Sequence, residues 1–181
     1  TISTSGQTTS ATVTIPFSPT FAGADLNEKI SDAITSDMKV VKTIGTYFSS
    51  TSNGRMQMTL QAITPGDSAF ILIDHNWAAP DSFKTSNPNY KLSSQRYWKV
   101  DGILPQLFDA EGSITYDGRT TATSGGSSWL DDKLITANNQ EDSIVLLYRK
   151  NASDDWDLFQ YYSKTSLQFT HSLSKTVLYF L

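Results

Sequence analysis

Apolar and polar residues alternate along several short stretches of this chain, as they do in strands with one buried and one exposed face. In residues 55–61, Met56, Met58 and Leu60 alternate with Arg, Gln and Thr. Residues 12–17 alternate in the same way, with Val, Ile and Phe at every second position. Both patterns predict half-buried antiparallel strands.

Two other stretches are continuously apolar over the length of a strand, residues 70–73 (FILI) and 144–147 (IVLL). Residues 70–73 lie between the turn-forming residues 65–67 (PGD) and the polar residues 74–76 (DHN). Short apolar runs bounded in this way are typical of strands buried on both faces. We therefore expect 70–73 and 144–147 to be central strands.

Further strand patterns follow, each bounded by Gly, Asn, Asp or Ser. They cover residues 38–48, 96–101, 113–117, 143–150, 156–162, 166–171 and 175–181. Helical spacing occurs only at 25–34 and 130–136, which are shorter than an isolated helix needs. About ten to twelve strands at this spacing predict an all-β fold, most simply two tandem immunoglobulin-like sandwiches with very little helix.

The composition of two segments predicts the domain organisation. Residues 1–12 are small and polar, which is typical of a flexible linker. Residues 80–94 consist largely of turn formers, so we place a domain boundary near Ser94. The expected units are the linker at 1–12, a first sandwich at 13–94 and a second at 95–181.

Charge and composition exclude some partners. The 181 residues carry a net charge of −4, so no excess of basic residues is present to bind nucleic acid or an anionic membrane. No apolar run is long enough for a transmembrane helix, and we expect no membrane insertion. The chain has no cysteine, which excludes disulfides and thiolate metal ligands, and its opening residues suggest a piece of a longer protein.

The sequence contains no recognised catalytic motif. Its two histidines, His75 and His171, are far apart and neither belongs to an H-E-x-x-H pair. Nucleophile-elbow and phosphate-binding glycine motifs are also missing. We therefore predict no catalytic, cofactor-binding or metal-binding residue, and expect His75 to cap the strand that precedes it. A hydrolase would need a Ser, a His and an acid to meet in the fold.

Clustered carboxylates offer a weak alternative, a calcium site. Asp109, Glu111 and Asp117 surround two glycines, and Asp pairs occur at 131–132 and 154–155. None has the spacing of a calcium-binding loop, whereas Asp beside Gly or Asn commonly initiates turns. Turn formation is the favoured interpretation.

Aromatic residues are the remaining candidates for binding. Trp77, Tyr97 and Trp129 are possible surface contacts, and exposed aromatics are how many β modules capture sugar rings. Core packing is the competing role: Trp98 shares a face with Arg96 and Val100, and Trp156 alternates with Leu158. A sugar-binding platform would require two or more of Trp77, Tyr97, Trp129 and Trp156 to lie coplanar on an exposed face.

Several segments resemble the region downstream of the catalytic domain in secreted bacterial zinc aminopeptidases of the gluzincin family. They are residues 32–45 (DAITSDMKVVKTIG), 74–80 (DHNWAAP), 95–105 (QRYWKVDGILP), 108–118 (FDAEGSITYDG), 129–131 (WLD) and 142–156 (DSIVLLYRKNASDDW). The resemblance covers most of residues 26–160. It implies that the zinc-binding H-E-x-x-H domain lies upstream, so no catalytic residue and no zinc site carries over to this chain.

Taken with the missing motifs, the resemblance predicts a non-catalytic accessory or spacer region of an exported zinc metallopeptidase. The expected partners are the upstream peptidase domain and a protein or polysaccharide substrate. The expected location is secreted, either extracellular or at the cell surface. The alternative is a carbohydrate-binding β-sandwich module that uses exposed aromatic residues.

Overall fold

The regular structure of the chain is almost entirely β in a computed structural model, which describes residues 12–23, 33–50, 56–116, 143–160, 162–165, 168–174 and 178–180. Its strands are β1 (Ile34–Val41), β2 (Tyr47–Ser50), β3 (Met56–Ala62), β4 (Ala69–Asn76), β5 (Tyr97–Ile103), β6 (Asp109–Thr115), β7 (Leu147–Arg149), β8 (Asp157–Leu158), β9 (Tyr162–Thr165), β10 (Gln168–Ser174) and β11 (Leu178–Phe180). The predicted all-β class is confirmed.

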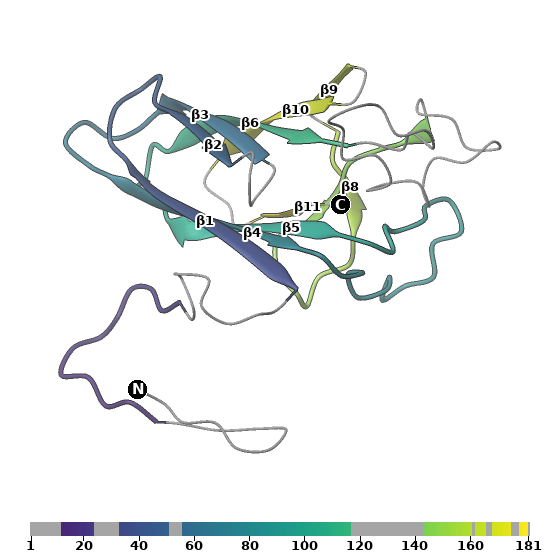
Figure 1. Cartoon of the computed structure of the whole chain (residues 1–181), viewed down its shortest axis with the longest axis horizontal. Coiled ribbons are helices and arrows are strands. Elements are labelled where there is room, and N and C mark those ends of the chain that lie inside the picture. The colour runs from purple at the N-terminus through teal and green to yellow at the C-terminus, as the bar shows by residue number, and fades with distance from the viewer. Residues whose placement is uncertain are drawn as a thin grey trace.

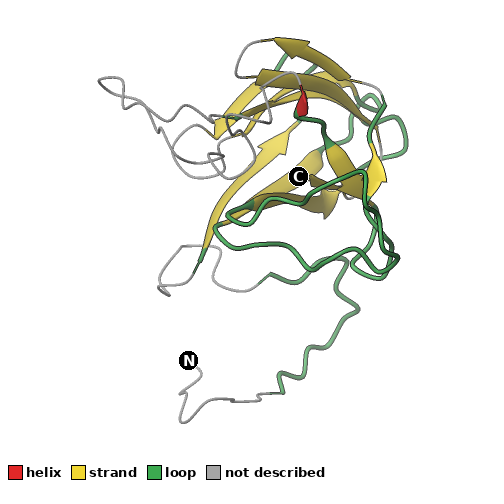
Figure 2. Ribbon diagram, turned by 90° about the vertical axis from the view of Figure 1, so that its right-hand side faces the viewer, coloured by secondary structure: helices red, strands yellow, loops and turns green. Residues whose placement is uncertain are grey.

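The strands form two antiparallel sheets that lie as two layers (Figures 1 and 2). The first sheet has six strands in the order β1-β4-β5-β11-β7-β8, and the second has five in the order β2-β3-β6-β10-β9. Most neighbours in a sheet are not consecutive in the sequence, so connections repeatedly cross from one layer to the other.

One apolar core fills the space between the sheets. Met56, Met58 and Leu60 are all buried within it, which confirms the face that their alternation predicts. The core draws side chains from both layers: Val41, Phe48, Met56, Met58, Leu60, Ile63, Ala69, Ile71, Ile73, Trp98, Val100, Phe108, Ala110, Ile114, Tyr116, Leu146 and Phe159.

Strand β4 is a central strand buried on both faces, as predicted for residues 70–73. Ile71 and Ile73 belong to the core, while Leu72 points to the opposite face and is still only 7% exposed. Residues 144–147 differ from the prediction because the strand begins only at Leu147. Leu146 is nevertheless buried in the core, since an apolar side chain can pack there without strand backbone.

The described strands do not separate into the predicted tandem units at residues 13–94 and 95–181. β4 pairs with β5 over seven residues of the first sheet, and β3 pairs with β6 in the second. Both pairs cross the expected boundary near Ser94, so the described strands form one sandwich. The polar composition of 80–94 reflects a long connection from β4 to β5.

The strand predicted within residues 12–17 is also absent. These residues form no strand, and Val13, Ile15 and Phe17 are 70%, 41% and 67% exposed. Alternation gives a segment the pattern of a strand but does not supply a partner for its backbone. The segments with helical spacing lie outside the described residues, except that 33–34 lead into β1.

Gly102 is required because the backbone of β4 passes close to it. Its φ is 152°, and a Cβ atom there would lie 2.0 Å from the carbonyl oxygen of Phe70. Neither atom can move without displacing the pairing of Gly102 with Ile71. The backbone of β5 therefore tolerates no side chain at this position.

We expect Gly102→Ala to destabilise the protein by at least about 3 kcal/mol, because the methyl group must push the two central strands apart. Denaturant unfolding would measure the change. Gly66→Ala is the matched control, since Gly66 also has a positive φ but has no atom within 4 Å of the added Cβ. Equal losses in the two variants would contradict the close-approach argument.

We also expect residues 95–181 alone not to fold cooperatively. In that half, β5 loses β4 and β6 loses β3, so both strands acquire an open edge and the core loses much of its lining. Circular dichroism during heating would show no sharp transition. A midpoint equal to that of the whole chain would contradict a single shared core.

Candidate functional site

Two groups of polar and aromatic side chains are the candidate sites of the described structure. We call the first the aromatic stack; it comprises His75, Trp77, Arg96 and Trp98. His75 and Trp98 are opposite each other in the β4–β5 pairing, and their rings stack with centroids 4.9 Å apart at 7°. The His75 ring also contacts Trp77, with centroids 4.1 Å apart. Because His75 is fully buried, its imidazole is part of the packing.

Arg96 joins the stack to the second sheet. Its guanidinium carbon lies 4.6 Å from the centre of the Trp98 ring, and Nη2 donates to the carbonyl oxygen of Thr115 at 3.0 Å. The hydroxyl of Ser93 accepts the backbone N–H of Arg96, which fixes the chain at the entry to β5. Arg96 is only 1% exposed, so its charge serves contacts inside the sandwich.

The aromatic residues predicted as surface contacts are placed differently from one another. Trp77 is half-buried, and its indole N–H donates to the Thr35 hydroxyl at 3.1 Å. Tyr97 is also half-buried, on the face of β5 opposite Trp98. Trp129 lies outside the described residues. Trp156 is 4% exposed, so it forms no part of an exposed platform.

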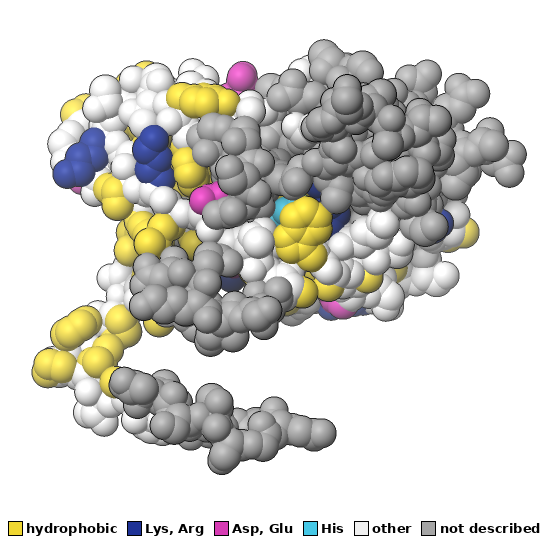
Figure 3. Space-filling view, in the orientation of Figure 1, with side chains coloured by type: hydrophobic (Ala, Val, Ile, Leu, Met, Phe, Trp, Pro, Cys, Tyr) yellow, Lys and Arg dark blue, Asp and Glu magenta, His cyan; other side chains and the backbone are white. Residues whose placement is uncertain are grey.

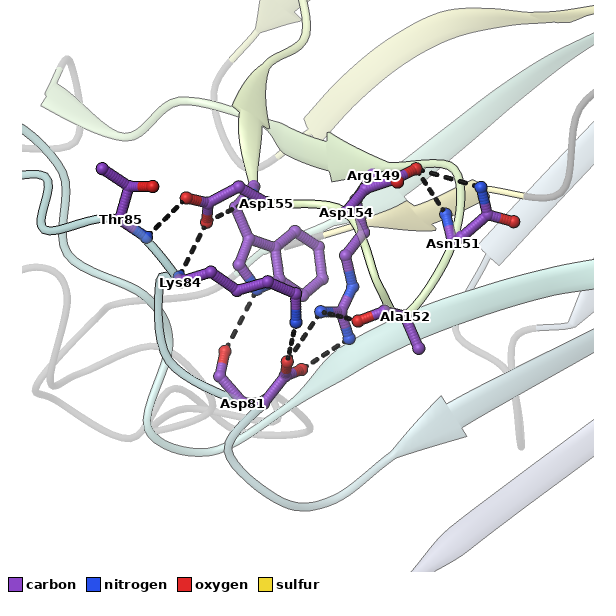
Figure 4. Close-up of polar contacts among 9 residues, drawn as sticks. Asp81, Lys84, Thr85, Arg149, Asn151, Ala152, Asp154 and Asp155 are labelled. Carbon is purple, nitrogen blue, oxygen red and sulfur yellow. Dashed lines mark hydrogen bonds and ion pairs between the residues drawn. The ribbon is translucent and has the colours of Figure 1, made fainter.

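The second group, which we call the loop clamp, comprises Asp81, Arg149, Asp155 and Trp156 (Figure 4). Arg149 of β7 directs two nitrogens at the carboxylate of Asp81, with Nη1 at 2.8 Å from Oδ2. Its guanidinium also lies 4.4 Å from the centre of the Trp156 ring. A bidentate pair stacked on an indole is a geometry that arginine forms and lysine does not.

The other members of the clamp fasten the same loop at separate points. Trp156 donates its indole N–H to the Asp81 carbonyl oxygen at 3.1 Å. The carboxylate of Asp155 accepts the backbone N–H groups of Lys84 at 3.1 Å and Thr85 at 2.8 Å. Together these bonds hold the β4–β5 connection against the β7–β8 hairpin.

Both clamp carboxylates have a lowered pKa. The hydrogen bond from Arg149 is the largest cause for Asp81, and its positive charge acts in the same direction. The backbone N–H of Thr85 is the largest cause of the lowered pKa of Asp155. In both cases the fold stabilises the ionised form.

Of the clustered carboxylates, Asp155 belongs to the loop clamp, whereas Asp154 bonds within its own turn. Asp154 accepts the backbone and side-chain N–H groups of Asn151, at 3.1 Å and 3.0 Å. Within the described ranges, no group of three or more His, Asp or Glu side chains is placed to hold a metal ion. Asp117 and residues 131–132 lie outside these ranges.

The predicted cap at His75 is corrected by the structure. His75 lies inside β4, one residue before its end, because the strand continues past the apolar run to Asn76. His171 lies in β10 of the second sheet and pairs with Gly112. The clamp itself was not predicted, since Asp81 and Arg149 are separated by 68 positions and no local pattern relates them.

The aromatic stack and the loop clamp both hold strands and loops of the chain together. Among the described residues, the two buried arginines are engaged with an indole, a carbonyl oxygen or a carboxylate of the chain itself. Within the part of the chain that is described, no helix has the length and apolar character to span a membrane. Comparisons with protein-family models, curated proteins and solved structures gave no match.

We expect Asp81→Asn to lower stability by about 1 to 3 kcal/mol at neutral pH, because buried Arg149 loses its charged acceptor. The hydrogen bond from Arg149 holds the folded pKa of Asp81 below the 3.8 of an unperturbed aspartate, so the stabilisation by this carboxylate is fully present above pH 3.8. It is lost as the pH falls through the lower folded pKa.

The measurement is the melting midpoint between neutral pH and strong acid. The variant should lose less stability on acidification than the unaltered chain does. Asp67→Asn, in the exposed turn between β3 and β4, is the control. It should leave the melting midpoint unchanged across the same pH range. Parallel acid profiles for Asp81→Asn and the unaltered chain would contradict the assigned role of this carboxylate.

Proposed function

We propose that this chain is a non-catalytic accessory domain of an exported zinc metallopeptidase, which supports the catalytic domain or positions protein substrate. The observation that carries the proposal is how its buried charges are used. Arg149 is 6% exposed and ends on Asp81 and Trp156, and Arg96 ends on Thr115 and Trp98. These groups stiffen a β scaffold, which is what a spacer or contact domain requires.

The position of His75 supports contact over catalysis. A general base must come within hydrogen-bond reach of the proton that it removes. His75 has no exposed surface and lies against the two indoles of Trp77 and Trp98. A substrate would have to displace a tryptophan to reach it.

The resemblance to the region downstream of the gluzincin catalytic domain supplies the parent protein in this proposal. Two of the resembling segments carry the aromatic stack: residues 74–80 include the last three residues of β4, and residues 95–105 contain the whole of β5. In this proposal the zinc and its H-E-x-x-H ligands belong to the upstream domain, and the chain functions outside the cell or at its surface.

The first test is a peptidase assay on the purified chain supplied with zinc. We expect no hydrolysis of aminoacyl substrates, because metal-activated water requires a ligand set that we place in the upstream domain. Chelator-sensitive turnover by the isolated chain would contradict the proposal.

The second test uses the parent polypeptide with and without residues 13–181. We expect the deletion to lower turnover of folded protein substrates more than turnover of a small aminoacyl substrate, or else to lower the melting midpoint of the catalytic domain. Equal effects on both substrate classes, with an unchanged midpoint, would argue against an accessory role. The coding sequence upstream of residue 1 should contain H-E-x-x-H.

A further inference from the structure

An apolar surface crosses the outer face of the first sheet. Val40, Phe70 and Ile103 are neighbours in register across β1, β4 and β5, and Met38 lies two residues before Val40 on the same face. We call these four residues the apolar row. Met38, Val40 and Ile103 are 45%, 56% and 40% exposed, although they occupy the middle and end of regular strands.

Two more exposed apolar side chains lie in the turns that follow β1 and β5. Ile44 follows the end of β1 and is 60% exposed, and Leu107 follows the end of β5 and is 59% exposed. Figure 3 shows hydrophobic side chains on this side of the sandwich and on the chain segment that projects beside it. Exposed apolar side chains that are neighbours on one face of a sheet, as in the apolar row, mark candidate interaction sites.

Residues 12–23, the projecting segment, carry a second exposed apolar set. Phe21 anchors the segment, since its ring meets Phe70 of the apolar row edge-on at 5.1 Å. Val13, Ile15 and Phe17 precede this anchor and are all exposed. Figures 1 and 2 show residues 12–23 projecting away from the sandwich.

We propose that the apolar row is a dimerisation surface, and that its occupant is the Val13, Ile15 and Phe17 face of the projecting segment from a second copy of this chain. Within one copy, the Phe21 ring packs on Phe70, so one aromatic side chain of this segment already contacts the row. Each copy of the chain carries both a projecting segment and an apolar row that can receive one. Two copies can therefore exchange segments about a twofold axis and leave no unmatched site.

The two prolines of the segment favour contact with a second copy over contact with the sheet of its own chain. Pro16 and Pro19 fix their own φ angles and keep Ile15 and Ser18 out of the helical region. The segment therefore turns back less readily onto the sheet beside its anchor. It also loses less conformational entropy when a second copy immobilises it.

The test measures the mass of the 181-residue chain by analytical ultracentrifugation from micromolar to millimolar concentration. We expect a monomer–dimer equilibrium. Phe17→Asp on the segment and Val40→Asp on the row should each weaken the dimer by roughly tenfold or more. Ile34→Asp is the matched control, because Ile34 is 39% exposed at the other end of β1 and should leave dimerisation unchanged.

Mixing the two defective variants separates segment exchange from general stickiness. The Phe17→Asp chain keeps an intact row and the Val40→Asp chain keeps an intact segment. The mixture should therefore form a heterodimer through one unaltered contact, whereas a homodimer of either variant has an altered residue in both contacts. Melting midpoints of the variants establish that each is folded. A monomer at every concentration, including one with its segment protected from protease by its own sheet, would overturn the proposal. Dimers that survive both substitutions, or a mixture that stays monomeric, would also overturn it.

Discussion

The antiparallel pairing of β4 with β5 is the interaction on which the rest of this structure depends. It joins the two halves of the sequence at the centre of the first sheet, and it requires Gly102 because the two backbones meet there. The same register places His75 on Trp98 at one end of the pair and Phe70 beside Ile103 at the other. A shift of one residue would send each of these side chains to the wrong face.

The long connection between β4 and β5 would be a weakness if it were loose, because such loops lose much entropy when they are ordered. The clamp offsets this loss at three separate points, through the Asp81 carboxylate, the Asp81 carbonyl and the Asp155 carboxylate. Its donors come from β7, from the residue before β8 and from the loop backbone. The segment whose composition resembles a linker is therefore held against the sheet to which both of its ends belong.

Sequence pattern predicted what depends on neighbours in the chain. The all-β class, the buried face of Met56, Met58 and Leu60, and the shared face of Arg96, Trp98 and Val100 follow from the two-residue period of a strand. Pairing across long separations leaves no such signal, so neither the β4–β5 pairing across the boundary expected near Ser94 nor the Asp81–Arg149 contact could be predicted. The alternation of 12–17 predicted a strand that the chain does not form on its own sheets, because pattern does not specify a partner.

The two ends of the β4–β5 pair differ in chemistry, and the difference follows from how each end is closed. At the His75 end, arginine, indoles and a long clamped loop supply partners for the polar groups, which keeps buried charge from destabilising the sandwich. At the Phe70 end the strands finish in short turns that bring no comparable cover, so Val40 and Ile103 remain exposed beside a single anchored phenylalanine. Water contact with such side chains is unfavourable in proportion to their area. The second end is therefore the one left available for the proposed contact with a second copy, because the first has already committed its side chains to the fold.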